Sequence, residues 1–316
     1  MINFPIDYVF PYVNNFDQIW RQNYEKYCIQ TKQRGRIDNI DGERYRDNGC
    51  LPFVFRSIEK HAPFINNIFL IVSNKEQVPK WLDKTKVKII LHEDFIPQEY
   101  LPTYNSCTIE MFLPDIPGLS DHFIYGNDDM YFGADVTPED YFTNKGLPKL
   151  SMNTWNATRD NSQYWSVCHN LYNQLVTKLE LTPLENGGFI VPIHGFTPVN
   201  KQLAVKARKF LWEDIEPNIT NFRTNSNYNQ YIYSEYAYLT DKFEESQRTV
   251  SYLAIERKRI NRIIDALISA KNQEVVINDT EKTTSSDLRF ISTFMKKNLL
   301  KIYPNKSIYE IMDGVK

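Results

Sequence analysis

Two adjacent carboxylates interrupt an apolar segment of the chain. The segment runs from Phe123 to Phe132 with the sequence FIYGNDDMYF, and such a run of aromatic and β-branched residues is typical of a buried strand. Ionised carboxylates in these surroundings are costly unless a cation or a hydrogen-bond donor meets them. A divalent metal that holds phosphate oxygens would meet Asp128 and Asp129. The alternative is a polar hairpin turn, because Gly126 and the two residues after it all favour turns.

Two other predicted strands carry oxygen ligands. A strand near the start of the chain contains Asp7, and one near the end leads into Asn278 and Asp279. Ligands in open parallel sheets bind outside the carboxyl ends of the strands, so we expect these side chains to join the first pair in one crevice. Oxygen ligands without paired His or Cys favour Mg²⁺ or Mn²⁺ over Zn²⁺. Judged singly, a capping hydrogen bond for Asp7 and a turn for Asn278-Asp279 are the simpler interpretations.

His194 is the histidine best presented for catalysis. It lies in the strand-like run GGFIVPIHGFTP, residues 187–198, which leads into a Gly/Pro turn and could present a rigid imidazole at a cleft. A hydrogen-bonded structural histidine is the commoner alternative. Arg223 precedes an aromatic-rich helix and Arg56 lies on a predicted helix. Guanidinium groups suit phosphate, although most single arginines are surface groups.

The composition restricts the class of protein. The chain has 316 residues, enough for one large α/β domain, and its net charge of -2 argues against nucleic-acid binding. Its four cysteines include no CxxC pair, so neither a zinc site nor a disulfide framework is indicated. No apolar run approaches the roughly 20 residues that span a bilayer, and residues 1–7 lack the pattern of a signal peptide. We therefore expect a soluble, cytoplasmic protein.

Strand and helix patterns alternate along the first half of the chain. The predicted strands are residues 6–10, 67–72, 87–91 and the segment around Asp128 and Asp129, and the predicted helices are about 18–33, 51–61 and 107–113. This alternation implies right-handed βαβ units and a mostly parallel sheet. The second half is mainly helical, with predicted helices at about 200–213, 228–239, 250–270 and 285–303 and a strand at 274–277. Residues 145–192 show little periodicity.

A series of short motifs runs in order into the Asp128-Asp129 segment. The motifs are RSIEKHAP at 56–63, PKWL at 79–82, HED at 92–94, LPTYNS at 101–106 and IPGLS at 116–120. Together with FIYGNDDMYF they resemble the second and longest block of the Stealth family of sugar-1-phosphate transferases. That family includes bacterial capsular polysaccharide phosphotransferases and the animal lysosomal-enzyme GlcNAc-1-phosphotransferase.

The family's other three blocks have counterparts as well. IDYVFPYVN at 6–14 resembles the first block, His194 and Pro198 followed by Phe222-Arg223 resemble the third, and residues 277–279 with the final helix resemble the fourth. The first block usually has Trp where Tyr12 stands and Gly in place of Asn15. Residues 50–52 also depart from the usual acidic-Leu-Arg pattern. These departures concern the donor sugar and leave the implied reaction type unchanged.

The resemblance implies both a fold and a reaction. The fold would be Rossmann-like and glycosyltransferase-A-like, with a mostly parallel sheet, flanking helices and a helical C-terminal half. The reaction would be metal-dependent transfer of a hexose-1-phosphate from a UDP-sugar to a hydroxyl of an oligosaccharide or lipid-linked glycan, giving phosphodiesters in a bacterial capsular or surface polysaccharide. We expect one catalytic domain over 1–316. Its parts would be a nucleotide-sugar-binding part (1–145), a helical acceptor part (146–273) and a strand and helix that return to the core (274–316).

The resemblance also implies a role for each candidate residue. The implied ligands of Mg²⁺ or Mn²⁺ are Asp128, Asp129, Asn278 and Asp279. The implied catalytic residues are His194 as general base, Arg223 as a clamp on the transferred phosphoryl group, and Asp7 near the nucleotide or the metal. The implied substrate-binding residues are Arg56, Asn105 and Asn127.

Two other functions remain open at this point. An ordinary metal-dependent glycosyltransferase would share the site but release UDP instead of UMP, and a non-catalytic polysaccharide-binding protein would use its aromatic residues as a sugar platform. The motifs GxxxxGK[ST], GxGxxG and GxSxG are absent, which argues against a P-loop enzyme, a Rossmann dehydrogenase and a serine hydrolase. The final helix carries Lys296, Lys297 and Lys301 beside apolar residues. A packed helix with a solvated face is the favoured interpretation, and peripheral contact with an anionic membrane is the second.

Overall fold

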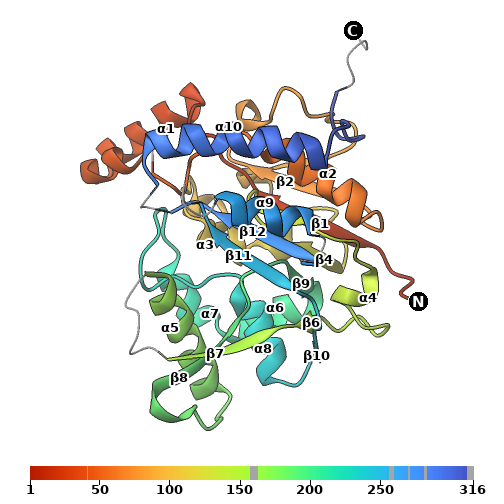
Figure 1. Ribbon diagram of the computed structural model, residues 1–316. Coiled ribbons are helices and arrows are strands. Elements are labelled where there is room, and N and C mark those ends of the chain that lie inside the picture. Colours follow the sequence, from red (N-terminus) through yellow and green to blue (C-terminus); the bar gives the residue numbers. More distant parts are fainter. Residues whose placement is uncertain (41, 157–162, 256–259, 270, 281–282, 312–316) are drawn as a thin grey trace.

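A five-stranded sheet forms the centre of the molecule (Figure 1). The computed structural model describes residues 1–316 except positions 41, 157–162, 256–259, 270, 281–282 and 312–316. In spatial order the strands are β3 (Lys88–Leu91), β2 (Ile68–Val72), β1 (Ile6–Pro11), β4 (His122–Tyr125) and β9 (Thr197–Asn200). The first four are mutually parallel, and β9 pairs antiparallel with β4. The predicted α/β class with a mostly parallel sheet is confirmed.

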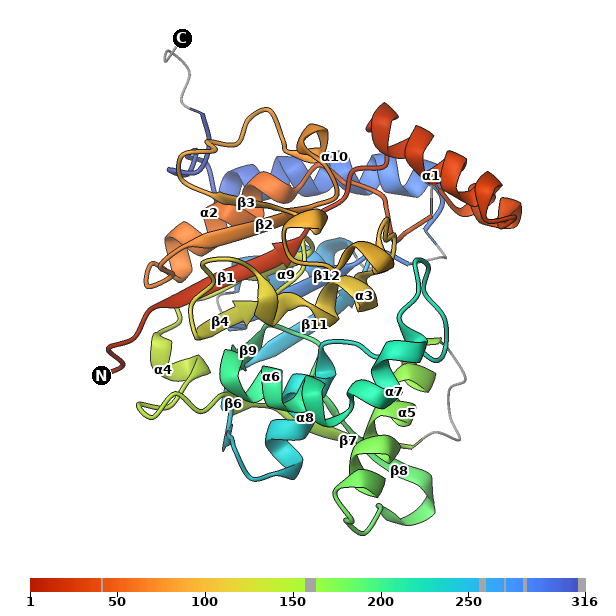
Figure 2. The same ribbon diagram turned by 180° about the vertical axis from the view of Figure 1, so that it is seen from behind.

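Helices cover both faces of this sheet, as Figures 1 and 2 show from opposite sides. One face packs against α2 (Leu51–His61), α9 (Ile260–Ile268) and α10 (Ser285–Ile302). The other packs against α3 (Ser106–Met111), α5 (Gln163–Lys178), α6 (Lys201–Phe210) and α8 (Tyr231–Leu239). Tyr8 and Phe10 of β1 belong to the first apolar cluster and Val9 to the second. Successive strand side chains point to opposite faces, so burial on both sides explains the continuous apolar runs of β1 and β2.

A second, three-stranded sheet lies beside the central one. It consists of β11 (Val250–Ala254), β12 (Glu274–Asn278) and β5 (Met130–Phe132). β11 and β12 are parallel, and β5 is antiparallel to β12. Two predictions are therefore corrected. The run from Phe123 to Phe132 is two short strands in different sheets with the two carboxylates between them, and the predicted helix 250–270 begins as a strand.

The error at 250–270 has a local cause. The apolar helical spacing of Ile260, Ile263, Ile264 and Leu267 is real, and these four residues are buried in α9. Leu253 also packs against the core. It lies in strand β11, however, because pairing with β12 outweighs the helical spacing of the apolar residues. Residues 256–259, which the same prediction covered, lie outside the described ranges.

The remaining elements lie around these two sheets. Two small ribbons pair β6 (Lys149–Leu150) with β10 (Glu244–Glu245) and β7 (Met152–Asn156) with β8 (Gly188–Pro192). Three further helices are α1 (Gln18–Gln30), α4 (Pro138–Tyr141) and α7 (Trp212–Ile215). Short 3₁₀ helices occur at Arg34–Asn39, Lys75–Gln77, His92–Asp94, Gln98–Tyr100, Leu113–Asp115, Glu185–Gly187 and Glu216–Asn218. None of the helices in the described ranges combines the length and the apolar composition of a membrane span.

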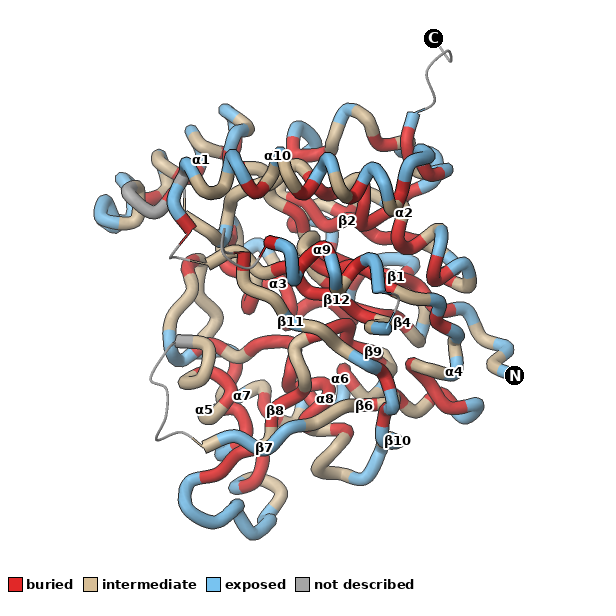
Figure 3. The backbone as a smooth tube through the Cα atoms, in the orientation of Figure 1, coloured by how far each residue is buried: buried red, intermediate tan, exposed pale blue. Residues whose placement is uncertain are grey.

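The last helix packs along one side of the molecule with a solvated outer face (Figure 3). Ile291, Met295 and Leu299 recur every four residues and are buried, whereas Lys296, Lys297 and Lys301 are exposed, as expected for a packed amphipathic helix. The helix begins at Ser285, as the predicted range 285–303 indicates. The cap is Thr284, whose side chain accepts a hydrogen bond from the backbone N–H of Asp287 at 3.2 Å.

Candidate active site

The loop that carries Asp128 and Asp129 crosses from the central sheet to the second sheet. Its first residue, Gly126, donates a backbone hydrogen bond to Val9 O (3.1 Å), and Asp129 O accepts one from Ile277 N (2.9 Å). A Cβ atom at Gly126 would overlap the hydroxyl of the buried Tyr8, so a larger residue here would displace Tyr8 from the core. The loop is thereby fixed at the carboxyl ends of β1, β4 and β12.

Asp128 and Asp129 form a partly buried acidic pair. Burial raises the pKa of Asp128 well above its usual range, and the charges of Asp129 and Asp47 raise it further. Burial also raises the pKa of Asp129 to about 7, with a further contribution from Asp279. Within the described part of the chain, Asp129 Oδ1 is buried and has no hydrogen-bond partner. An uncompensated pair of this kind calls for a cation.

The donor set fits a divalent metal that is shared with a substrate. No group of three or more His, Cys, Asp or Glu side chains among the described residues could hold a metal ion by itself. Mg²⁺ is usually bound by one or two carboxylates together with water and substrate phosphates. Asp128 and Asp129 match this mode of binding, with a diphosphate supplying further oxygen ligands.

The two predicted ligands from the end of β12 have protein partners. Asp279 accepts two hydrogen bonds from the guanidinium of Arg46, at 2.8 and 2.9 Å. Arg46 also donates to Thr280 O and Thr283 O, so it holds the turn after β12 in place. Asn278 accepts a backbone hydrogen bond from Ile255 N at 2.8 Å. Both residues lie beside the acidic pair, and Arg46 competes with a metal for the Asp279 carboxylate.

His194 lies between β8 and β9, with its imidazole among aromatic rings. Its Nδ1 is 2.9 Å from the hydroxyl of Tyr231, and that hydroxyl is 2.9 Å from the hydroxyl of Tyr164. Burial lowers the pKa of His194 to about 4, and the positive charge of Arg223 adds to the effect. The imidazole is therefore neutral at physiological pH. With Nδ1 held by Tyr231, Nε2 is the nitrogen that can take a proton.

Two arginines form a cationic pair near His194. Arg223 donates from Nη2 to Ser106 Oγ. Burial lowers the pKa of Arg44, and the neighbouring charge of Arg223 lowers it further. Like charges held close together are characteristic of an anion site, and guanidinium groups bind phosphate well. The sequence pointed to Arg223 but not to Arg44, because residues 35–48 read only as a charged loop.

Tyr252 is the second residue that sequence reasoning missed. Its ring centroid is 5.3 Å from that of His194. Burial raises the pKa of Tyr252, the charge of Asp129 raises it further, and the nearby side chain of Asn278 slightly lowers it. The side chain is nevertheless 51% exposed. Tyr252 therefore lies between the imidazole and the acidic pair and faces solvent.

These contacts bring five of the predicted residues into one neighbourhood, namely Asp128, Asp129, Asn278, His194 and Arg223. Asp279 lies at its margin with Arg46. Asn127 lies in the acidic loop itself, where its carbonyl accepts a hydrogen bond from Met130 N at 3.3 Å.

The structure does not bring Asp7 to this neighbourhood. Asp7 lies at the amino end of β1, whereas the acidic pair lies at the carboxyl end. Its carboxylate is fully buried and accepts hydrogen bonds from Asn66 Nδ2 (2.9 Å), Asn67 N (3.1 Å) and Ser120 N (2.8 Å). These donors compensate the buried charge, and Asp7 joins the loops that precede β2 and β4.

Arg56 and Asn105 also make structural contacts. Arg56 forms a bidentate pair with Glu310, with both distances 2.7 Å, and donates to Tyr303 O, so it anchors the end of the chain. Asn105 caps α3 through Cys107 N (3.1 Å) and donates to Asn227 Oδ1 (3.0 Å). Asn105 thus supports the segment that carries Arg223 without facing the acidic pair.

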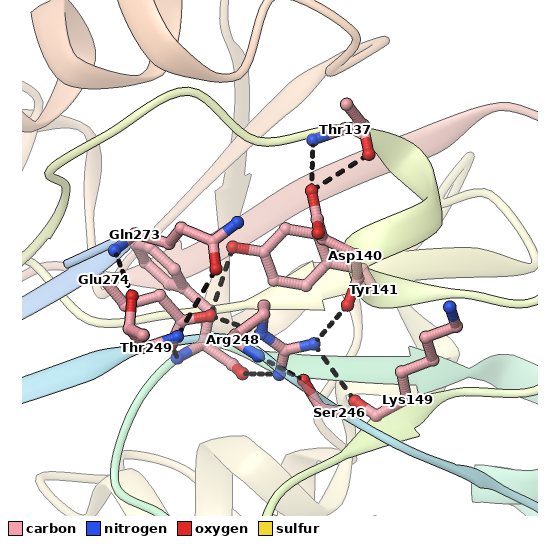
Figure 4. Close-up of polar contacts among 10 residues, drawn as sticks. Thr137, Asp140, Tyr141, Lys149, Ser246, Arg248, Thr249, Gln273 and Glu274 are labelled. Carbon is pink, nitrogen blue, oxygen red and sulfur yellow. Dashed lines mark hydrogen bonds and ion pairs between the residues drawn. The ribbon is translucent and has the colours of Figure 1, made fainter. Parts of the chain in front are cut away.

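A buried ion pair holds the backbone next to His194 (Figure 4). Arg248 Nε lies 2.6 Å from Glu274 Oε1, and Glu274 Oε2 accepts a hydrogen bond from Phe196 N at 2.8 Å. Arg248 also donates to the carbonyls of Asp140 (2.7 Å) and Lys149 (3.1 Å). A Cβ atom at Gly195 would overlap Glu274 Oε2. The pair therefore joins the start of β12 to the two residues that follow His194.

Breaking this pair should strongly destabilise the fold. The Glu274→Gln variant leaves the buried Arg248 without its counter-charge, and we expect a loss of about 3–5 kcal/mol in the free energy of unfolding. Chemical denaturation measures the change. The matched control is Asp115→Asn, which breaks the more exposed pair with Arg208 and should cost no more than about 1 kcal/mol. Equal losses in the two variants would contradict this assignment.

Comparison with known proteins identifies a matching family model and several relatives. Residues 44–150 match the family model described as Stealth protein CR2, conserved region 2, and this range contains all of the motifs from residue 56 to residue 132. The exopolysaccharide phosphotransferase cps2G of Lactiplantibacillus plantarum is 39% identical over 150 residues, which cover 47% of this chain and 42% of that protein. The capsular polysaccharide phosphotransferase WcwK of Streptococcus pneumoniae is 42% identical over 147 residues, which cover 46% and 43%.

A further relative aligns along almost its whole length. The receptor polysaccharide phosphotransferase WefC of Streptococcus gordonii is 28% identical over 342 residues, which cover 97% of this chain and 99% of that protein. The aligned part of this chain thus covers less than half the length of cps2G and of WcwK. The alignment with WefC extends over the segments that carry His194, Arg223 and Tyr252.

Proposed function

Because this chain belongs to the Stealth family, we propose that it transfers a hexose 1-phosphate from a UDP-sugar to a hydroxyl of a glycan. The product would be a phosphodiester in a bacterial capsular or surface polysaccharide. The observation that carries the proposal is the convergence of an acidic pair, a neutral imidazole and a pair of guanidinium groups at the ends of β4, β8 and β12. The names of these relatives, all polysaccharide phosphotransferases, support the same reaction class.

In this reaction the acceptor oxygen attacks the phosphorus atom that bears the sugar. A new P–O bond forms to the acceptor, the P–O bond to the uridylate breaks, and UMP leaves. The proton of the acceptor hydroxyl goes to Nε2 of His194, while Tyr231 holds the other nitrogen. The imidazole starts neutral because its pKa is about 4, and the negative diphosphate nearby favours the protonated product.

The charged residues bind the diphosphate. Arg223 and Arg44 hold non-bridging oxygens of the transferred phosphoryl group, where charge accumulates during the reaction. Asp128 and Asp129 hold Mg²⁺ or Mn²⁺, which when bound neutralises charge on the diphosphate and on the departing UMP. The side chain of Asn278 lies next to that of Tyr252 and helps to position it. Residues 1–145 supply most of the donor site and residues 146–273 the base and the acceptor side, within one catalytic domain.

The released nucleotide tests this proposal. We expect the protein, given Mg²⁺, a panel of UDP-sugars and glycan acceptors, to release UMP in step with a new phosphodiester signal by phosphorus NMR. Chromatography of the nucleotides provides the measurement. Release of UDP would instead identify an ordinary glycosyltransferase, which breaks the bond at the anomeric carbon. A protein that binds glycans and consumes none of the UDP-sugars would contradict the enzymatic proposal altogether.

A further inference from the structure

A row of aromatic rings leads away from the active site through His194. Tyr252 and Tyr164 both contact the imidazole edge to face, with ring centroids 5.3 and 6.2 Å from that of His194. Tyr164 contacts Trp165 edge to face at 4.8 Å. Trp165 in turn stacks on Trp155 at 4.5 Å with the rings within 3° of parallel. The row thus connects β11 with α5 and β7.

The two ends of this row face solvent. Tyr252 is 51% exposed and Trp155 is 37% exposed, whereas Tyr164 and Trp165 are partly buried. Because Trp165 covers one face of the Trp155 ring, the exposed area of Trp155 lies on its other face and its edges. Tyr164 is held by its hydroxyl contact with Tyr231 at 2.9 Å. The supporting rings are therefore fixed, and the end rings are available to a ligand.

Trp155 and His194 belong to one rigid unit. β7 pairs with β8 along its whole length, and Trp155 lies directly opposite Phe189, which is fully buried. β8 ends at Pro192, two residues before His194. Figure 1 shows this ribbon on the side of the molecule remote from α1 and α10. A ligand that extends from the imidazole along the row would reach Trp155 over a short run of sugar residues.

The chemistry around Trp155 suits a neutral glycan. Its neighbours on β7 are Asn153, Thr154 and Asn156, all polar and uncharged, and Asn153 shares the Trp155 face of the strand because strand side chains alternate. A pyranose has an apolar C–H face that packs on an aromatic ring and hydroxyls that need such hydrogen-bond partners. A nucleic acid would require cationic residues, which Met152–Asn156 lacks, and a lipid would require a wider apolar patch.

We propose that Tyr252 and Trp155 bind the acceptor glycan, with Tyr252 at the sugar that carries the attacking hydroxyl and Trp155 at a sugar further along the chain. This inference rests on the proposed function, in which Nε2 of His194 takes the proton of that hydroxyl. It follows that the substrate class is an oligosaccharide or longer glycan and that a monosaccharide reaches only the Tyr252 end of the row.

Acceptor length provides the kinetic test. Trp155→Ala should raise KM for a tetrasaccharide acceptor about tenfold, the loss of one aromatic stacking contact. The kcat, the KM for the UDP-sugar and the KM for the corresponding monosaccharide should not change. Trp155→Phe keeps an aromatic face and should restore most of the affinity. An equal change in KM for both acceptors, or a change for neither, would overturn the proposal.

Direct binding separates this inference from the proposed function. Calorimetric titration without donor, using neutral tetrasaccharides of glucose, galactose and N-acetylglucosamine, gives a Kd that does not depend on catalysis. A tenfold higher Kd for Trp155→Ala would support glycan binding by the aromatic row even if the protein consumes no UDP-sugar. Equal Kd values in wild type and Trp155→Ala, or no binding to wild type, would overturn the proposed glycan site even if the enzyme is active. Phe290→Ala, which removes a 40% exposed ring from α10, is the control and should leave Kd unchanged.

Discussion

Replacing His194 with Ala should lower kcat by roughly 10²–10⁴-fold, the usual contribution of a general base. The variant removes the only nitrogen in the row that can accept the acceptor proton, but it leaves the arginines and the acidic pair in place. We therefore expect the KM for the UDP-sugar to change little. Steady-state release of UMP at saturating Mg²⁺ measures both quantities.

Tyr231→Phe separates the base from its support. This variant keeps the imidazole but removes the hydroxyl 2.9 Å from Nδ1, so it should lose a smaller part of kcat than His194→Ala. Undiminished turnover in His194→Ala would remove the residue from the mechanism. A loss in Tyr231→Phe as large as that in His194→Ala would point to Tyr231 as the reacting group instead.

The pH profile follows from the surroundings of His194. The groups that face it are Tyr231 from α8, Tyr164 from α5, Tyr252 from β11 and the cation of Arg223. Burial raises the pKa of each of these tyrosines, so they stay neutral. A base whose pKa is about 4 is active while unprotonated, so its contribution persists as the pH falls from 8 to about 5 and disappears below that. A midpoint near 6.5 at saturating Mg²⁺ would indicate a different base.

Asp129→Asn should abolish metal-dependent activity. The substitution removes one of the two charges that would hold Mg²⁺ or Mn²⁺, and a metal that neutralises a diphosphate contributes several kcal/mol to catalysis. We expect a fall in kcat/KM of roughly 10³-fold or more. Without metal, the variant should be at least as stable as wild type, because it relieves the repulsion between two adjacent, partly buried carboxylates.

Thermal melting measures this effect independently of activity. A ligand that binds only the folded protein at 100 times its Kd stabilises it by about 2.7 kcal/mol, so Mn²⁺ or Mg²⁺ should raise the Tm of wild type. The same titration should leave the Tm of Asp129→Asn unchanged. Asp115→Asn, which removes a surface carboxylate, should respond as wild type does. A metal shift of equal size in Asp129→Asn would show that the ion binds elsewhere.

Local patterns predicted the four parallel strands of the central sheet but not β9 at its edge. A continuous apolar run such as Ile68–Val72 has few possible structures other than a buried strand. Asp128 and Asp129 were recognisable as candidate ligands because burying a carboxylate among apolar residues costs free energy. The same reasoning failed for Asp7. A carboxylate inside a buried strand signals a compensating partner, but the sequence does not reveal whether the partner is a metal at one end of the sheet or backbone N–H groups at the other.

Long-range pairing accounts for what the sequence did not reveal. Tyr252 was hidden because β11 becomes a strand only through its pairing with β12, some twenty residues further on. Arg46 was overlooked because its partner, Asp279, is remote in sequence. Single residues in a charged loop carry no periodicity, so their roles become visible only once the chain is folded.

The anchoring of the acidic loop in two sheets bears on how substrates enter and leave. Gly126 is hydrogen-bonded to the central sheet and Asp129 to the second sheet. A rotation of one sheet away from the other would therefore break one of these two backbone hydrogen bonds. We therefore expect the carboxylates of Asp128 and Asp129 to keep their positions throughout turnover. We therefore expect any opening and closing during turnover to involve the irregular segments that bear Arg44 and Arg223, whose charges lie close together.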